Sequence, residues 1–315
     1  MKCLVTGAAG YIGSFLVKRL VTEGHEVTAL IHKNKPIDVV EKANYVTADL
    51  TQIDSVEPLL KNIDYVFHCA AYVKDYGPKN IFFKINYEAT VNLSKACEKA
   101  GVKKFVFLSS HINYETYDRA NYYSKTKLMA EKYLLEQYKT KKFPVIIIRP
   151  GHVFGPGHAM WVVYPIRAIQ KNRISLIDNG NRIFSHTYID NLIDAIILSL
   201  KQDKAIGQTI DITDGDNNTT WGDYLNHLAR LSGKPGIKRN MSKRTAMLVA
   251  KFMMISYKIF RIKPWVTPMS VNIFTNTEKI SVSKAKSLIG YVPKVNYDEA
   301  MEKIEEWLRR EKYIS

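Results

Sequence analysis

The chain opens with Met1-Lys2-Cys3-Leu4-Val5-Thr6-Gly7-Ala8-Ala9-Gly10-Tyr11-Ile12-Gly13. The apolar run at residues 2–6 predicts a buried strand, and residues 11–23 have the pattern of an amphipathic helix. Between them, Gly7 suits the positive φ of a tight turn, Gly10 leaves the backbone open to a ligand, and Gly13 lets the helix pack close to the strand. The free N–H groups and positive dipole end of such a helix favour a phosphate. Because another apparent strand follows at residues 26–31, we predict a dinucleotide site that uses Gly7, Gly10, Tyr11, Ile12 and Gly13.

Composition and charge narrow the class of protein. Of the 315 residues, 46% are hydrophobic, which is enough for a large buried core. The formal net charge of +16 is high, yet the lysines are spread along the chain and form no long basic run between aromatic residues. This pattern favours an anionic cofactor or substrate over a nucleic acid.

The cysteines and the hydropathy pattern bear on the compartment. Cys3, Cys69 and Cys97 are scattered in apolar runs or on a predicted helix, which is typical of neither a disulfide framework nor a metal site. Reduced, packed thiols indicate the cytosol. We find no signal peptide before the first strand and no apolar run of about 18 residues, the length that spans a membrane. We therefore expect a cytoplasmic protein without a metal.

The end of the second strand bears on cofactor choice. NAD-specific folds usually place a carboxylate there to bind the ribose 2′-OH. Here the first acid is Asp38, whereas His32, Lys33 and Lys35 are placed to meet a 2′-phosphate. The pattern favours NADP, with NAD as the alternative cofactor and a solvated charged surface as the alternative role of these side chains.

Strands and helices alternate through the first half, which predicts a parallel, doubly wound α/β sheet. Apolar runs at residues 65–71, 105–108 and 145–149 predict further strands, and we expect helices over residues 52–60 and 78–100. Ser109 and Ser110 follow one of these strands, and ligands bind at the carboxyl ends of strands in such sheets.

Tyr123 and Lys127 are four residues apart on the next predicted helix and therefore share one face. A free tyrosine has a pKa of about 10, and a nearby ammonium favours its phenolate form. With a serine hydroxyl from the preceding strand end to bind the substrate oxygen, the three groups predict a proton relay next to a hydride carrier. Tyr122 is a weaker candidate because Thr126 stands four residues after it.

These motifs resemble those of the extended short-chain dehydrogenase/reductase family. The matching stretches are residues 6–13, Ala48-Asp49-Leu50, His68-Cys69-Ala70-Ala71, Ser109-Ser110, Tyr123 with Lys127, and residues 149–157. The resemblance implies a Rossmann-type doubly wound parallel sheet with a smaller, mostly helical C-terminal cap that binds substrate. It also implies a catalytic set of Ser110, Tyr123 and Lys127, and cofactor contacts at Asp49, Leu50, Ala70, Ala71, Tyr123, Lys127, Pro150, Gly151 and Val153. Asn86 matches an asparagine that is frequent in the family.

The domain division follows from the same resemblance. We expect residues 1–157, joined by about residues 183–215, to form the NAD(P)-binding domain, and residues 158–182 and 216–315 to form the cap. One departure concerns the catalytic serine: only thirteen positions separate Ser110 from Tyr123, fewer than is usual in the family, so Ser109 stays an alternative.

The stretch 177–194 and the tail 283–293 are similar to the 3β-hydroxysteroid dehydrogenase branch, and His152 stands where nucleotide-sugar epimerases commonly have asparagine. The leading hypothesis is an oxidoreductase that interconverts a secondary alcohol and a ketone in an apolar, 3β-hydroxysteroid-, 3-oxoacid- or dihydroflavonol-like substrate. The alternatives are a nucleotide-sugar epimerase or dehydratase with tightly held NAD(P), and a non-catalytic NADP-binding protein. The resemblance also implies a homodimer through residues 78–100 and the helix that carries Tyr123.

The segment 241–262 is unusually apolar, with Arg244, Lys251 and Lys258 spaced seven residues apart on one narrow stripe of a helix. One interpretation is a cap helix mostly buried against the nucleotide half. The other is a Met-rich lid that contacts a lipid-like substrate or lies weakly on an anionic membrane. In either case we expect this segment to roof an apolar substrate pocket.

Overall fold

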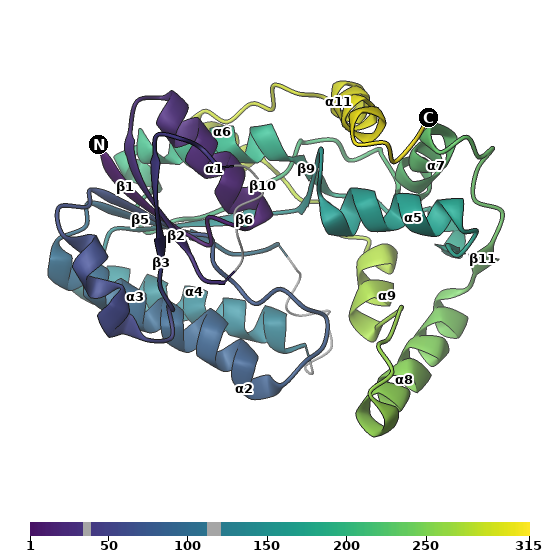
Figure 1. Ribbon diagram of the computed structural model, residues 1–315, viewed down its shortest axis with the longest axis horizontal. Coiled ribbons are helices and arrows are strands. Elements are labelled where there is room, and N and C mark those ends of the chain that lie inside the picture. The colour runs from purple at the N-terminus through teal and green to yellow at the C-terminus, as the bar shows by residue number, and fades with distance from the viewer. Residues whose placement is uncertain (34–38, 112–120) are drawn as a thin grey trace.

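The computed structural model describes residues 1–33, 39–111 and 121–315, and Lys35 and Asp38 therefore lie outside the described residues. A seven-stranded parallel sheet forms the centre of the larger lobe, in the order β3-β2-β1-β4-β5-β6-β10 (Figure 1). The chain adds β2 and β3 on one side of β1, then returns to add β4 and the later strands on the other side. This order confirms the doubly wound fold. The strands are β1 (Lys2–Thr6), β2 (Glu26–Ile31), β3 (Ala43–Thr47), β4 (Tyr65–His68), β5 (Lys104–Leu108), β6 (Val145–Pro150) and β10 (Thr209–Ile212).

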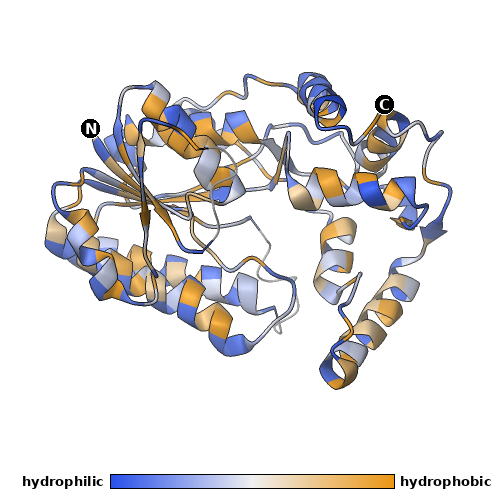
Figure 2. Cartoon of the chain, in the orientation of Figure 1, coloured by the Kyte–Doolittle hydropathy of each residue, from blue (hydrophilic) through white to orange (hydrophobic). Residues whose placement is uncertain are grey.

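Helices cover both faces of this sheet. In Figure 1, α1 (Tyr11–Thr22) and α6 (Ile189–Leu200) lie above it, and α2 (Lys79–Phe82), α3 (Ala89–Ala100) and α4 (Tyr122–Lys141) lie below. Neighbouring strand residues enter different cores, since Val5 belongs to the cluster under α1 and α6 and Leu4 to the cluster under α3 and α4. Burial on both faces explains the nearly continuous apolar strands, which are orange in Figure 2.

The smaller lobe lies at the carboxyl ends of the strands (Figure 1). It contains α5 (Tyr164–Gln170), α7 (Trp221–Leu231), α8 (Lys243–Phe260) and α9 (Pro268–Thr275), with a short sheet of β8 (Leu176–Ile177) and β11 (Asn240–Met241). A second short sheet pairs β7 (His152–Phe154) with β9 (His186–Tyr188) and leads the chain back towards β10. The last helices are α10 (Ser283–Ile289) and α11 (Tyr297–Arg310). Although the sequence places residues 216–315 in the cap, α10 packs against β10 and α6.

Two expected helices differ in the structure. Residues 52–60 form two short 3₁₀ segments, Ile53–Ser55 and Glu57–Leu60, because Pro58 cannot donate the backbone hydrogen bond that a continuous helix needs. The long helix over residues 78–100 contains a π segment, Phe83–Glu88, between α2 and α3. Such segments are frequent at functional sites, and this one carries Asn86. The homodimer expected through this helix and α4 stays a prediction that light scattering tests.

The expected helix over residues 241–262 is α8, and its burial differs from the first interpretation. Only Ala246 and Ala250 of α8 are buried. The helix packs mainly on α9 and meets the nucleotide half through a ring contact of Tyr257 with Tyr76. Within the described ranges, no helix is both long enough and apolar enough to cross a bilayer.

Candidate active site

The glycine turn between β1 and α1 is formed by close backbone approaches. Gly7 has φ +69°, and a Cβ atom there would lie 2.7 Å from the backbone of Ala70. A Cβ atom on Gly13 would lie 2.3 Å from the carbonyl oxygen of Gly7. Larger residues at either position would force the first turn of α1 away from the strand ends, so the turn depends on glycine at both.

The N-terminus of α1 fits the pyrophosphate of a dinucleotide. Gly10 is its N-cap and contributes no side-chain hydrogen bond, so the first N–H groups of the helix have no side-chain acceptor at the cap. The hydroxyl of Tyr11 is buried and has no hydrogen-bond partner among the described residues. Ile12, the next residue, is half-buried at the same end of the helix. The open N–H groups at this end of the helix favour an anionic group there.

The end of β4 is joined to the end of β1 by a buried histidine. The ring of His68 is hydrogen-bonded to Thr6 Oγ1 at 2.8 Å and to Thr90 Oγ1 at 2.9 Å. Burial lowers the pKa of His68 to about 3, so the ring is neutral. It connects the two strand ends by hydrogen bonds and does not act as an acid or base. Just beyond it, Ala70 and Ala71 are half-buried at the strand end, where small side chains leave room for a cofactor.

At the end of β2, the tertiary structure adds a carboxylate that the local sequence lacks. Asp49 Oδ2 lies 3.8 Å from His32 Nε2, although the two residues are 17 apart in the chain. Hydrogen bonds from Thr51 are the largest cause of a lowered Asp49 pKa, so this group stays ionised. Lys33 is exposed beside them, and Leu50 is buried in the core below. Positive and negative groups therefore both stand where the adenosine end of a dinucleotide is expected.

The predicted catalytic tyrosine is placed by a helix cap. The side chain of Asn121 accepts hydrogen bonds from the backbone N–H groups of Tyr123, at 3.0 Å, and Ser124, at 3.3 Å, and so starts α4 at this point. The side chains of Tyr123 and Ser110 share a hydrogen bond. Burial raises the pKa of Tyr123 to about 12, against a smaller opposing effect of that bond. The phenol is therefore protonated at neutral pH, which is opposite to the depressed pKa expected from Lys127.

Lys127 lies one turn after Tyr123 and is almost completely buried. Its Nζ donates to the carbonyl oxygen of Leu108, at the end of β5, and lies 4.0 Å from the centre of the Phe107 ring. Burial lowers the pKa of Lys127 to about 7, partly offset by Glu131. In this arrangement the ammonium is directed at the strand end, which explains why it does not depress the pKa of Tyr123.

Asn86 connects the π segment to the catalytic helix. Its Oδ1 accepts from the backbone N–H of Tyr72 at 2.7 Å, and its Nδ2 donates to the Tyr72 carbonyl at 3.2 Å and to Thr126 Oγ1 at 3.3 Å. The asparagine thus holds the segment after β4 against α4. It is a positioning residue in this structure.

The family resemblance implies cofactor contacts at the end of β6 and directly after it. Pro150 and Val153 are buried, and Gly151 is half-buried at the cavity described below. A Cβ atom on Gly151 would lie 2.3 Å from the carbonyl oxygen of Ser185, so this glycine also permits the crossing of two chain segments.

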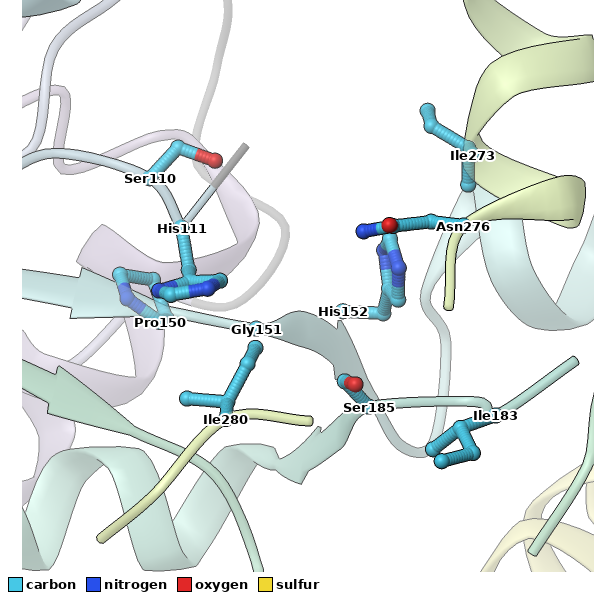
Figure 3. A pocket seen from close by; sticks show the side chains of 10 residues that line it. All are labelled: Ser110, His111, Pro150, Gly151, His152, Ile183, Ser185, Ile273, Asn276 and Ile280. Atoms are coloured by element: carbon cyan, nitrogen blue, oxygen red, sulfur yellow. The ribbon is translucent and has the colours of Figure 1, made fainter. Parts of the chain in front are cut away.

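A cavity lies between the two lobes at the carboxyl end of β5. Figure 3 shows Ser110 and His111 on one side, with the Ser110 hydroxyl directed towards the open space, and Ile273 and Asn276 of the cap on the other. The described lining consists of Ser110, His111, Pro150, Gly151, His152, Ile183, Ser185, Ile273, Asn276 and Ile280. None of these is in the segment 241–262, so the expectation that this segment roofs the pocket is wrong: α9 and the residues after it line the cavity, and α8 lies behind them.

Sequence reasoning missed the histidine next to the catalytic serine. His111 Nδ1 lies 2.8 Å from Asp211 Oδ1, and its Nε2 lies 3.7 Å from Glu278 Oε1. These partners are distant in the chain. In the sequence, only the position of His111 directly after Ser110 could have indicated that this histidine lies at the site. The other cavity histidine, His152, has its pKa lowered to about 3 by burial and is neutral.

A half-buried arginine is adjacent in the chain to this lining. Arg182 precedes Ile183, and its Nε is buried without a hydrogen-bond partner among the described residues. A guanidinium in this position is able to receive an anionic group of a ligand.

Comparisons with known proteins agree with this geometry. Residues 3–213 match the NAD dependent epimerase/dehydratase family. The chain is 30% identical to sterol-4-alpha-carboxylate 3-dehydrogenase, decarboxylating, of Mus musculus, over 96% of this chain and 89% of that protein. It is 27% identical to a 3-beta-hydroxysteroid dehydrogenase of Mycolicibacterium neoaurum, over 95% of this chain and 89% of that protein.

A solved structure supports the fold. UDP-glucuronic acid 4-epimerase from Bacillus cereus, in complex with UDP-glucuronic acid and NAD, aligns with a TM-score of 0.78 and 23% identity, over 98% of this chain and 99% of that chain. At this identity the likeness concerns the fold alone.

The doubly wound sheet, the open helix N-terminus and the Ser110–Tyr123 pair at a cavity define an enzyme of the short-chain dehydrogenase/reductase class. The chain belongs to the NAD dependent epimerase/dehydratase family, and its relatives place it with the 3β-hydroxysteroid dehydrogenase-like branch.

Proposed function

We propose that this enzyme is an oxidoreductase that interconverts a secondary alcohol and a ketone in an apolar substrate. The observation that carries the proposal is the hydrogen bond between Ser110 and Tyr123 at the edge of the cavity between the lobes. Lys127, one turn further along α4, completes the set. Hydroxyl, phenol and buried amine are the groups that a carbonyl reduction needs for its proton.

The chemistry divides between cofactor and protein. A bound nicotinamide cofactor supplies or accepts the hydride. In the reducing direction, Tyr123 gives its phenolic proton to the carbonyl oxygen, because its raised pKa keeps it protonated at neutral pH. Ser110 donates a hydrogen bond to the same oxygen as negative charge develops there. In the oxidising direction, Tyr123 first loses its phenolic proton to solvent, and the phenolate then receives the proton of the alcohol, so the raised pKa makes this direction depend on high pH.

The cavity favours an apolar ligand. Ile183, Ile273, Ile280 and Pro150 contribute apolar surface, and the ten described lining residues include no Lys, Arg, Asp or Glu. The polar groups of the lining are those of Ser110, His111, His152, Ser185 and Asn276. A diphosphate in this space would need cations that the lining itself does not provide. A ketone on an apolar body would place that body on the isoleucine and proline surface and its oxygen at a polar group such as Ser110.

We propose NADP as the preferred cofactor and NAD as the second. His32 and Lys33 are cationic or polar donors at the end of β2, where a 2′-phosphate would lie. Asp49 opposes this preference, because its carboxylate stands near His32 and suits a ribose hydroxyl.

One observation favours a second candidate, a nucleotide-sugar epimerase or dehydratase. The unpaired Nε of Arg182 is suited to a phosphate or carboxylate beside the cavity. In such an enzyme the same Tyr123 and Lys127 would act, and the cofactor would be retained through the cycle.

The test compares two panels of compounds. Purified enzyme is incubated with NADPH or NADH and either bulky apolar ketones or UDP-sugars, and both cofactor oxidation and sugar interconversion are measured. We expect net NADPH oxidation with ketones only. Interconversion of UDP-sugars without net cofactor turnover would establish the second candidate, and cofactor binding without any turnover would support a non-catalytic binding protein.

Arg182→Met sharpens the comparison. If the substrate is a neutral ketone, this variant retains turnover within about threefold, because no charge partner is lost. If the substrate carries a diphosphate, the variant loses about 100-fold in kcat/KM, the effect of removing a charge-assisted hydrogen bond worth about 3 kcal/mol.

A further inference from the structure

The solvent side of α8 carries a continuous apolar ridge. Leu248, Phe252, Ile255 and Ile259 are 70%, 70%, 54% and 65% exposed. Their spacing of four, three and four residues places them on one face of the helix. We call these four residues the α8 ridge. Figure 2 shows α8 as a largely hydrophobic helix at the lower end of the smaller lobe, extending away from the rest of the molecule.

The ridge does not belong to the protein core. The opposite face of α8 is the one that packs, with Ala246 and Ala250 buried in a cluster with Ile177 and Val271. The apolar surface continues at Phe260, the last residue of α8, and beyond the helix at Ile262 and Trp265; these side chains are 69%, 57% and 70% exposed. A contiguous exposed apolar surface of this kind marks a place where the protein meets another apolar phase or partner.

The charge around the ridge indicates which partner this is. Residues 224–277 contain no Asp or Glu and ten cations: Arg230, Lys234, Lys238, Arg239, Lys243, Arg244, Lys251, Lys258, Arg261 and Lys263. This one segment carries ten charges of a net +16 for the whole chain. Within α8, the seven-residue spacing of Arg244, Lys251 and Lys258 places them in a stripe directly beside the ridge.

We propose that the α8 ridge lies in the surface layer of a bilayer that contains anionic phospholipids. An apolar face flanked by lysine and arginine is the arrangement of helices that lie in the plane of a membrane. The apolar side chains enter the acyl boundary, while the long cationic side chains reach the headgroup phosphates. Trp265, at the end of the ridge, has the amphipathic ring that is enriched at membrane interfaces.

The same observations disfavour a second copy of the chain as the partner. Two ridges facing each other would bring two cationic stripes together without an acidic residue from this segment between them. An anionic lipid surface instead supplies the opposite charge along the whole stripe.

The hairpin of α8 and α9 also contacts the larger lobe. Thr267 Oγ1 donates to Asp75 Oδ2 at 2.9 Å, and the rings of Tyr257 and Tyr76 meet edge to face at 4.7 Å. Because α9 lines the cavity through Ile273, membrane-bound α8 holds the cavity close to the lipid surface. Membrane binding goes beyond the proposed reaction and does not depend on it.

The experiment is co-sedimentation of the full chain with phosphatidylcholine vesicles, with and without phosphatidylglycerol, at low and high salt and without any substrate. We expect binding to the vesicles that contain phosphatidylglycerol, at least tenfold weaker at high salt. The double variant Phe252→Glu/Ile259→Glu removes binding, and Lys251→Glu/Lys258→Glu weakens it at least tenfold.

Matched controls separate the ridge from a general effect of charge. Val292→Glu changes an exposed apolar residue outside the segment, and Lys99→Glu changes an exposed lysine on α3. Both should bind vesicles as the unchanged chain does. Thermal unfolding and NADP binding of all variants establish that they are folded, which is expected because every changed side chain is exposed.

Two results would overturn the proposal. One is the absence of binding to phosphatidylglycerol vesicles at low salt. The other is equal binding of the unchanged chain and the Phe252→Glu/Ile259→Glu variant. A dimer in light scattering that this variant dissociates, with no vesicle binding, would assign the ridge to a second copy instead.

Discussion

Ser110 and Tyr123 share a side-chain hydrogen bond across the cavity edge, although one follows β5 and the other begins α4. The short connection between them does not prevent the pairing. Ser110 also lines the cavity, whereas Ser109 does not, so the geometry favours Ser110 as the serine that meets the substrate oxygen.

This relationship predicts different effects for the two serines. Ser110→Ala should lower turnover about 100-fold, the usual effect of losing one donor to a developing oxyanion. Ser109→Ala is the control and should stay within about threefold. Tyr123→Phe should lower turnover by roughly two to four orders of magnitude with nearly unchanged cofactor affinity. Steady-state kinetics and cofactor titration measure both effects, and near-normal turnover of Tyr123→Phe would remove it from the catalytic set.

Substitutions at Gly10 and Gly13 should have different effects: one on the affinity for the cofactor and the other on the free energy of unfolding. A Cβ atom at Gly13 meets the Gly7 carbonyl oxygen at 2.3 Å, so Gly13→Ala should cost about 1–3 kcal/mol in the free energy of unfolding. At Gly10, with φ −80°, the added Cβ lies 3.1 Å from that oxygen and is nearly tolerated. Gly10→Ala should therefore keep its stability within about 1 kcal/mol but bind NADP at least tenfold more weakly, because the methyl group faces the phosphate site.

Chemical denaturation with and without NADP distinguishes these outcomes. In the unchanged enzyme, NADP at 100 times its Kd should add about 2.7 kcal/mol of stability. Equal NADP-dependent stabilisation of Gly10→Ala would contradict the assignment of the α1 N-terminus to the pyrophosphate.

Cofactor preference should depend on the end of β2. We expect a lower Kd for NADP than for NAD, and the double variant His32→Ala/Lys33→Ala should weaken NADP binding about tenfold while leaving NAD binding within about twofold. Asp49→Asn removes a negative group from the same site. Without the carboxylate near His32, binding of NAD should weaken more than binding of NADP. Isothermal titration with both cofactors measures these affinities in the unchanged enzyme and in the two variants, and an unchanged NADP affinity in the double variant would refute the preference.

Lys127 should make stability depend on pH. Its pKa is lowered from 10.5 to about 7 in the folded enzyme. Between these values the unfolded chain binds a proton that the folded chain does not, so stability rises with pH across this window. Lys127→Met lacks this contribution, and its stability relative to the unchanged enzyme should therefore fall from about pH 7 to about pH 9.5.

Urea denaturation of the cofactor-free enzyme at these two pH values provides the measurement. Lys125→Met, an exposed position on the same helix, controls for the loss of one surface charge. A pH-independent difference between Lys127→Met and the unchanged enzyme would mean that Lys127 is solvated in solution.

The fold and much of the candidate site follow from local patterns. The strand at residues 2–6, the glycine turn and the helix from Tyr11 are specified by neighbouring residues, because strand burial, positive φ and helix start are local properties. The helical spacing of Tyr123 and Lys127 is local in the same way. These patterns predicted the doubly wound sheet and placed Ser110 at its carboxyl edge, where the structure has it.

Only the tertiary structure decided what depends on groups distant in the chain. Asp49 lies beside His32 because β2 and β3 are neighbours in the sheet, and His111 pairs with Asp211 across the hundred residues between them. Burial, which raises the pKa of Tyr123 and lowers that of Lys127, is a property of the packed protein and not of the helix. The sequence by itself determined that α8 is apolar with a cationic stripe. Packing on α9 decided which of its faces remains in solvent, because a helix buries only the side that meets a complementary neighbour.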